Sequence, residues 1–185
     1  MTAMKTREEA WALVTSRLET RHLRFHMRAA EACMRALARR LGEDEDLWGI
    51  TGLVHDLDLD TVGPDLSRHG TVGAEWLAEA GYPEEVASAV RVHAGHGEPA
   101  TKLEKGLVAV DPITGFIVAA TLIRPDKKIA GLDVSSIRKR MKEKRFAANV
   151  NRAQIASVEA LGVETDEFIA ICLDAMRAIS GEIGL

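Results

Sequence analysis

The sequence Ile50-Thr-Gly-Leu-Val-His-Asp-Leu-Asp-Leu59 places a histidine and an aspartate, His55 and Asp56, inside a run of apolar residues. The apolar residues recur at spacings of three and four, which predicts a buried helix from about residue 46 to residue 57. An ionised carboxylate in such a helix must be paired or must bind a metal, because an uncompensated buried charge costs many kcal/mol. The stretch therefore predicts a helical core that contains a paired or metal-bound carboxylate.

The same apolar spacing continues along most of the 185-residue chain, and strand-like alternation is rare. We therefore predict an all-α fold, a single domain over residues 1–185 that forms a bundle of eight or nine helices. Residues 58–67 are expected to form a loop, and Pro112 is expected to kink or break the helix that contains it. The predicted helices cover about residues 6–19, 21–41, 46–57, 69–80, 83–94, 101–123, 135–148, 152–161 and 166–183.

The composition is that of a soluble globular protein, with 46% hydrophobic and 28% charged residues. The formal net charge of -4 provides no general basic field for nucleic acid, although six basic residues crowd into positions 138–145. The first ten residues are too polar for a signal peptide, and the longest apolar runs, 107–110 and 116–123, are too short to span a bilayer. We therefore expect a cytoplasmic protein without a membrane partner, and a nucleic-acid partner is not expected.

The six histidines all lie between residues 22 and 96. His26, His69 and His93 each share a predicted helical face with apolar residues, so their imidazoles are expected to point inward. For any one of them, the ordinary explanation is a core histidine that bonds to a backbone carbonyl. Three such histidines, together with the buried pair at residues 55 and 56, favour a shared site.

Asp111 is the only charged residue between Leu107 and Ile123, in a predicted helix that is otherwise apolar. A role in the same site would explain a carboxylate at this position. Because Pro112 follows it, however, Asp111 is also typical of an N-cap residue in front of the first residue of a helix. The residues alone leave both interpretations open.

Together these side chains form a mixed set of imidazoles and carboxylates. Such a set suits Mn, Fe, Ni, Co or Zn, with Mg a further candidate, and it is poor for Ca, which takes oxygen ligands. Six ligands exceed the needs of one tetrahedral site, and carboxylates can bridge, so the set predicts one or two divalent ions. The candidate ligands are His26, His55, Asp56, His69, His93 and Asp111.

The pattern of these residues resembles the HD domain superfamily of metal-dependent phosphohydrolases, and within it the small stand-alone bacterial and archaeal HD proteins. The resemblance covers nearly the whole chain. A His-Asp doublet alone would be a weak signal, but several segments occur at familiar spacings. They are Gly52-Leu-Val-His-Asp-Leu-Asp58, Arg68-His-Gly-Thr-Val-Gly-Ala-Glu75, Val110-Asp-Pro-Ile-Thr-Gly115 and Leu122-Ile-Arg-Pro-Asp-Lys-Lys128.

The resemblance implies how the candidate ligands divide between ions. In the binuclear HD branches, two further histidines hold a second ion with the aspartate of the doublet as a bridge, and His69 and His93 match their places. The short junction at residues 81–83 predicts antiparallel helices that bring these two histidines to the same end. We expect two ions, and the alternative is one ion with His69 and His93 in structural roles. The first ion would be held by His26, His55, Asp56 and Asp111.

Further residues are candidates for the edge of the site. His96 is either a proton donor or phosphate contact at the mouth of the site or an exposed loop residue. Asp58 either orients a metal-bound water or lies in a solvated turn. Lys127 and Lys128 are candidates for binding the substrate phosphate, because phosphate needs compensating cations. The basic cluster at residues 138–145 is either a solvated helix face or a second phosphate-binding rim.

The ligand set predicts hydrolysis of a phosphate ester. A metal ion lowers the pKa of bound water from 15.7 to about 7, so a metal-bound hydroxide can act as the nucleophile, and Asp56 would hold the catalytic metal. The expected substrate is a small phosphate ester or nucleotide, cleaved as a phosphomonoester or phosphodiester. Two alternatives remain: a non-catalytic, metal-stabilised module that binds a nucleotide or a partner, and a diiron oxygenase with the same ligands.

Overall fold

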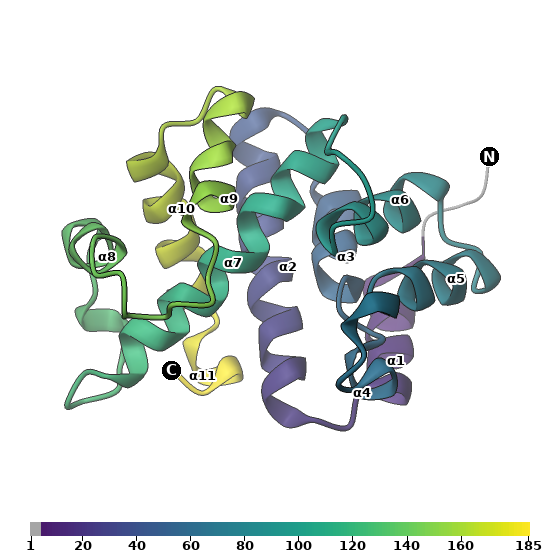
Figure 1. Ribbon diagram of the computed structural model, residues 1–185, viewed down its shortest axis with the longest axis horizontal. Helices are drawn as coiled ribbons and strands as arrows, with labels where there is room; N and C mark the ends of the chain where they lie inside the picture. Colours follow the sequence, from purple (N-terminus) through teal and green to yellow (C-terminus); the bar gives the residue numbers. More distant parts are fainter. Residues whose placement is uncertain (1–4) are drawn as a thin grey trace.

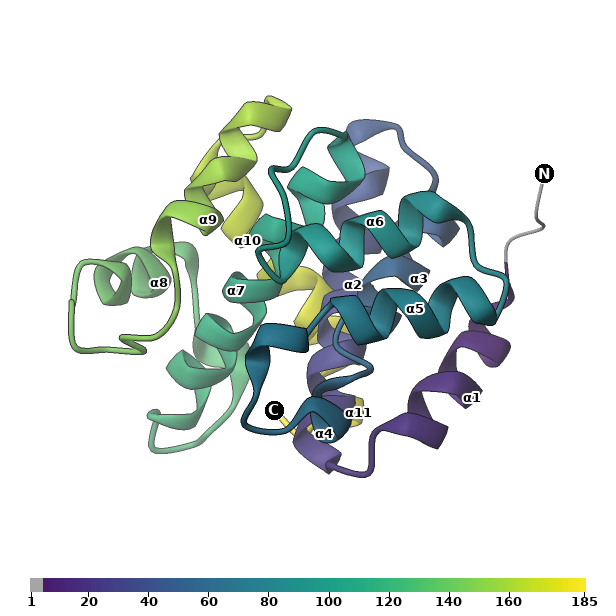
Figure 2. The ribbon, with the colours of Figure 1, turned by 45° about the vertical axis from the view of Figure 1, so that its right-hand side comes forward.

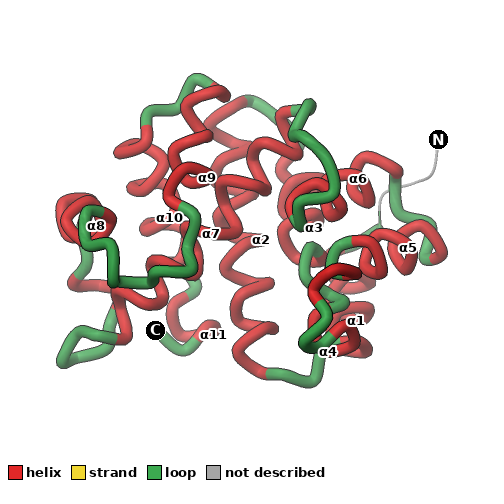
Figure 3. The backbone as a smooth tube through the Cα atoms, in the orientation of Figure 1, coloured by secondary structure: helices red, strands yellow, loops and turns green. Residues whose placement is uncertain are grey.

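The computed structural model describes residues 5–185, and the described part contains helices and no strands (Figure 3). The prediction of an all-α fold is confirmed. Three short 3-10 segments accompany the α-helices: η1 (Leu66–Arg68), η2 (Ile129–Gly131) and η3 (Ser157–Leu161). The α-helices are α1 (Arg7–Arg17), α2 (Arg21–Leu41), α3 (Glu45–Val54), α4 (Leu59–Val62), α5 (Thr71–Glu79), α6 (Glu84–His93), α7 (Lys102–Leu122), α8 (Val134–Met141), α9 (Arg152–Ala156), α10 (Thr165–Ala178) and α11 (Ser180–Ile183).

The two longest helices, α2 and α7, run through the middle of the molecule and pack against each other (Figure 1). On one side of them, α9 and α10 help to enclose an apolar cluster that contains Phe116 and Phe168. On the other side, α1, α3, α5 and α6 enclose a second cluster that contains Leu53 and Leu57. Helix α2 contributes to both clusters through Met34 and Met27 respectively, so it forms the wall between them.

Local sequence signals set several helix ends as predicted. Thr6 and Thr101 form capping boxes with Glu9 and Glu104, in which each threonine side chain accepts a bond from the third helical N–H. Gly42 ends α2 in the left-handed conformation, with a φ of 70°. These ends depend on contacts within a few residues, which is why the sequence predicts them.

Other boundaries differ from the prediction. Residues 58–67 are not a simple loop, because they contain α4 and most of η1. The helix expected from residue 69 begins at Thr71, since Gly70 has a φ of 75° and interrupts the backbone. The helix expected to reach residue 148 ends at Met141. The segment after it forms turns, and within these turns the Arg152 guanidinium donates to the carbonyls of Ala147 and Val150.

Helix α7 is continuous from Lys102 to Leu122, so of the kink or break expected at Pro112, the break does not occur. Asp111 therefore lies inside a helix, and the alternative that it is an N-cap residue is wrong. By length and composition α7 could cross a membrane, but 61% of its most apolar stretch is buried inside the protein. This is typical of the core helix of a soluble protein.

Candidate metal centre

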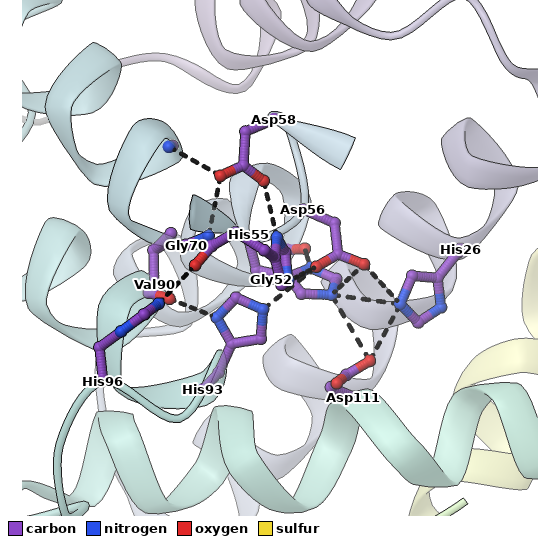
Figure 4. A network of polar contacts seen from close by, with 12 residues as sticks. His26, Gly52, His55, Asp56, Asp58, Gly70, Val90, His93, His96 and Asp111 are labelled. Carbon is purple, nitrogen blue, oxygen red and sulfur yellow. Dashed lines mark hydrogen bonds and ion pairs between the residues drawn. The ribbon is translucent and has the colours of Figure 1, made fainter. Parts of the chain in front are cut away.

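Side chains from α2, from α7 and from the two residues after α3 meet in one polar network, which Figure 4 shows with His26, Asp111, His55 and Asp56 labelled. His26 lies in the first half of α2, and Asp111 lies in the middle of α7. His55 directly follows α3, whose apolar face packs into the core, and Asp56 comes next. Packing of the three helices therefore brings together polar residues that are up to 85 positions apart in the sequence.

Helices α5 and α6 supply two more histidines. Figure 2 shows the two helices side by side, joined at one end by residues 80–83, so the start of α5 and the end of α6 share the opposite end. His69 lies two residues before α5, and His93 is the last residue of α6. Their rings are in edge-to-face contact, with centroids 5.1 Å apart. The antiparallel arrangement predicted from the short junction is confirmed.

Four donor atoms form a first group. Nε2 of His26 lies 3.1 Å from both Nε2 of His55 and Oδ1 of Asp111. Oδ2 of Asp56 lies 3.4 Å from Nε2 of His26 and 3.3 Å from Nε2 of His55. Two atoms bound at right angles to one ion, at about 2.1 Å each, lie roughly 3 Å apart. The four atoms therefore have the mutual spacing of ligands to a single ion.

The other oxygen of Asp56 belongs to a second group. Oδ1 of Asp56 lies 3.1 Å from Nε2 of His93 and 3.2 Å from Nε2 of His69. These three side chains and the four of the first group each form a set that could hold an ion. Asp56 thus offers one oxygen to each group and is the residue that they share.

Backbone carbonyls hold the outer nitrogens of two histidines. Nδ1 of His55 donates to the carbonyl of Gly52 at 2.8 Å, and Nδ1 of His93 donates to the carbonyl of Val90 at 2.5 Å. A carbonyl oxygen only accepts, so in each ring the hydrogen is on Nδ1. The lone pair of the neutral ring is therefore on Nε2, which faces the centre.

Side chains hold the outer nitrogens of the other two. Nδ1 of His69 donates to Oδ1 of Asp58 at 2.8 Å. Oγ1 of Thr114 donates to the carbonyl of Asp111 at 2.8 Å and therefore accepts from Nδ1 of His26 at 3.1 Å. In all four histidines a hydrogen bond at Nδ1 fixes the ring so that Nε2 points toward the donor groups. Histidine ligands of metals are ordinarily oriented in this way.

The charges at the centre influence one another strongly. Burial raises the pKa of Asp56, but the nearby His55 and hydrogen bonds from the histidines outweigh it and bring the pKa well below its usual value. Burial lowers the pKa of His26, but Asp111 and Asp56 outweigh it and raise the pKa to about 9. The pKa of His69 is also raised to about 9, because Asp56 and Asp58 outweigh burial. Without a metal, protons on the histidines compensate the carboxylates.

The donor set fits divalent transition-metal ions. Histidines are the only ion-pair partners of Asp56 and Asp111 among residues 5–185, so no lysine or arginine neutralises these carboxylates. The side chain of Asp56 is only 9% exposed, and a buried carboxylate requires a compensating cation. Mixed imidazole and carboxylate donors are typical of Mn, Fe, Co, Ni and Zn sites.

The model of the HD domain family matches residues 24–158. The chain belongs to the HD domain family. The expected family is thereby confirmed, and the matched range contains all six candidate ligands. HD domains form a superfamily of metal-dependent phosphohydrolases, in agreement with a histidine and aspartate cluster that could bind metal. A comparison with curated proteins finds no match.

Asp58 of this HD domain is placed differently from both alternatives that the sequence suggested. It is buried, and its oxygens accept hydrogen bonds from Nδ1 of His69 and from the backbone N–H groups of Gly70 and Gly73. The carboxylate thus lies behind His69, on the side away from the donor atoms. Asp58 is therefore not in a solvated turn, because it is buried under the start of α5. It is also not placed to orient a water at the metal site, because both of its oxygens accept hydrogen bonds from residues 69–73.

His96 is exposed in the turn after α6 and also contacts the site. Its Nε2 donates to the backbone carbonyl of His69 at 2.8 Å (Figure 4). His96 is therefore an exposed loop residue that bonds to the backbone of His69, and its expected role as a proton donor or phosphate contact stays a prediction. His22 is exposed one turn before His26 and is not in either donor group.

The structure does not bring Lys127 and Lys128 to the donor atoms. Both are exposed in the turn after α7, and Leu122 at the end of α7 is about 16 Å along the helix from Asp111. The basic cluster at residues 138–145 begins in α8, beyond the same end of α7 (Figure 1). Two of its arginines form ion pairs, Arg138 with Asp166 and Arg140 with Glu143, which supports a solvated surface.

Thr114 is a residue of the centre that our sequence analysis missed. It is buried, and it is the hydrogen-bond acceptor that orients His26. A signal was available, because Thr114 is a polar residue three positions after Asp111 and so lies on the same face of a helix that is otherwise apolar.

Proposed function

We propose that the protein is a metal-dependent phosphohydrolase that acts on a small phosphate ester or nucleotide. One observation carries the proposal: Asp56 directs one oxygen to each of two donor groups, and each of the four surrounding histidines is oriented by a hydrogen bond at Nδ1. This arrangement supports two ions on either side of one carboxylate. Two-metal sites are typical of enzymes that hydrolyse phosphate esters.

When bound, the ions would lower the pKa of a water molecule to about 7 and would polarise the phosphoryl group. The chain's own residues supply the shape of the site. The side chain of Asp111 is 35% exposed, whereas His55 is fully buried and Asp56 is 9% exposed, so the site opens on the side of Asp111. Substrate would enter from that side.

His96 is the candidate proton donor to the leaving group. Its Nε2–H is engaged by the carbonyl of His69, so Nδ1 is the atom that would carry the transferred proton. The ring is exposed to solvent beside the backbone of His69. General acid catalysis of this kind contributes typically 10²–10⁴-fold in rate.

The test combines metal analysis with a substrate panel. Protein purified without chelator should contain a divalent transition metal, and it should hydrolyse some members of a panel of phosphomonoesters and phosphodiesters with Mn, Ni or Mg added. Asp111→Asn should lose activity and metal, whereas Asp174→Asn, at an exposed aspartate paired with Arg177, should keep both.

Other outcomes would favour the two alternatives. Bound iron with a diiron absorption band in air, and oxygen consumption without phosphate release, would indicate an oxygenase. Stabilisation by a nucleotide without turnover of any ester would indicate a binding module. Either result would overturn the hydrolase proposal.

A further inference from the structure

A cavity of about 380 Å³ lies beside the metal centre, between the first half of α2 and the second half of α7. Residues 183–185, at the end of α11, form its third wall, and Figure 1 shows α11 beside the lower ends of both helices. The volume is in the range of small-molecule sites. The main wall residues are His22, His26 and Ala29 from α2, and Gly115, Val118 and Leu122 from α7.

The cavity adjoins the first donor group through His26. His26 belongs both to the cavity wall and to the first donor group. Gly115 in the wall is four residues after Asp111, so the two lie on the same face of α7, about 6 Å apart along the helix. A group bound in the cavity would therefore lie next to whatever is bound on the open side of the centre, where Asp111 is exposed.

The walls are almost entirely apolar. His22 and His26 are the only wall residues with polar side chains, and the others are aliphatic residues, glycines and Phe25. Leu122 at one end is 49% exposed, which is unusual for a large apolar side chain in this protein. A nucleobase or a sugar would lose water from several polar atoms here and could gain only the imidazoles of His22 and His26 as partners, and this loss is costly. An alkyl or aryl group would gain from the burial.

We propose that this cavity binds the apolar organic group of the substrate, so that the protein acts on phosphate monoesters of hydrophobic alcohols in preference to nucleotides. The inference rests on the proposed function for the chemistry, and on the cavity for the substrate class. The wall from Gly115 to Leu122 spans about 10 Å of helix, which suits a chain of several carbon atoms or an aromatic ring.

Gly115 allows a sharp test. A Cβ atom added at Gly115 would meet open space, and the residue lines the cavity, so a larger side chain would occupy the cavity without clashing at its root. Gly181 offers a matched control, because it also has open space around an added Cβ, is exposed and is not in the wall. Gly115→Leu and Gly181→Leu are therefore the same change inside and outside the cavity.

The first measurement is kcat/KM for ethyl phosphate, hexyl phosphate and AMP with the metal that copurifies. Wild type should prefer hexyl phosphate over both others by about tenfold or more, in keeping with the discrimination of apolar pockets. Gly115→Leu should reduce the hexyl-to-ethyl ratio by about tenfold, Gly115→Ala by less, and Gly181→Leu should keep it. Equal use of the ethyl and hexyl esters, or a preference for AMP, would overturn the inference and leave the hydrolase proposal intact.

The second measurement separates the two proposals. If the metal-loaded protein hydrolyses no ester, the proposed function fails, and binding of ethylphosphonate and hexylphosphonate is compared by calorimetry. About tenfold tighter binding of hexylphosphonate, lost in Gly115→Leu or reduced in Gly115→Ala, would support the cavity as a site for apolar groups. Equal binding of the two phosphonates would overturn it.

Discussion

Oδ1 of Asp58 accepts a hydrogen bond from Nδ1 of His69 at 2.8 Å, while Oδ2 accepts from the backbone N–H groups of Gly70 and Gly73. The carboxylate of Asp58, two residues after the His-Asp doublet, thus connects this part of the chain to the start of α5. His69 is thereby held with Nε2 3.2 Å from Asp56. A carboxylate in this position fixes the ring of a metal ligand and raises its basicity.

Replacing Asp58 with Asn should weaken binding of the second ion by about 10–100-fold, because Asn can accept hydrogen bonds but carries no charge. Binding of the first ion, which does not involve His69, should change little. Calorimetric titration of metal-free protein measures both affinities. Asp65→Asn, at an exposed aspartate of the same connection, should behave as wild type. Unchanged affinity for the second ion would rule out this role for Asp58.

Metal stoichiometry should distinguish the shared ligand from a ligand of one group. We expect two ions per chain in wild type, one in His93→Ala and none in Asp56→Ala, because only Asp56 contributes to both groups. Mass spectrometry of the metal content measures this directly. Bound metal stabilises the fold by about 2.7 kcal/mol at a free concentration of 100 times Kd, so Asp56→Ala should also lose metal-dependent stabilisation. A single ion in both wild type and His93→Ala would exclude a binuclear centre.

Thr114→Val should lower the affinity for the first ion by about 10–100-fold, because it removes the acceptor of the Nδ1–H group of His26. Thr114→Ser keeps a hydroxyl at the same place and should restore binding. Thr121→Val is the matched control, since the Thr121 hydroxyl is buried in the same helix and donates only to the carbonyl of Ile117. If Val and Ser at position 114 gave equal affinities, the hydroxyl would have no role in binding.

The metal-free protein should lose stability as the pH rises. His26 and His69 have pKa values of about 9 in the folded state, above the ordinary 6.5, so the folded state retains protons that the unfolded chain releases between these values. The contribution of these two protonated histidines to the free energy of unfolding is complete below about pH 6.5 and is lost by about pH 9. Urea unfolding of chelator-treated protein from pH 6 to pH 9 should show the decline, and His26→Gln should reduce it.

Metal affinity should show the opposite pH dependence and increase as the pH rises. Because bound histidine must be deprotonated at Nε2, binding releases protons, and the affinity should rise between pH 6.5 and pH 9. Titration in buffers of different ionisation enthalpy measures the number of protons released. Release of no protons at pH 7 would contradict the raised pKa values of His26 and His69.

Gly52→Ala should lower the free energy of unfolding by about 1–3 kcal/mol. A Cβ atom at Gly52 would lie 2.8 Å from the carbonyl oxygen of Ala30, where α2 and α3 pack closely. The same change at Gly115, which has open space, should instead stabilise its helix by up to about 1 kcal/mol. Urea unfolding compares the two. The close contact would be unimportant if Gly52→Ala were as stable as Gly115→Ala.

Local signals account for the features that could be predicted from the sequence. Apolar spacing predicts the all-α fold, and capping boxes at Thr6 and Thr101 predict two helix starts, because these interactions act over three or four residues. The residues of the centre also stand out, since histidines and aspartates within apolar helical segments require partners. The division of Asp56 between two groups followed from resemblance to a family and from the antiparallel order of α5 and α6.

Tertiary packing decided the features that the local rules missed. Pro112 removes a hydrogen bond within α7, yet the helix continues because apolar residues on both sides of it are buried in the core. The sequence predicts Asp58 in a loop. In the structure the start of α5 covers it, and its hydrogen-bond donors come from residues 11 to 15 positions later in the chain. Helical spacing in the sequence predicts that the imidazoles of His26, His69 and His93 point inward, but it does not predict the burial of Asp58. Which of their atoms face one another, and where the adjoining cavity lies, depends on how α2, α3, α5, α6 and α7 pack, because contacts over as many as 88 residues have no local pattern.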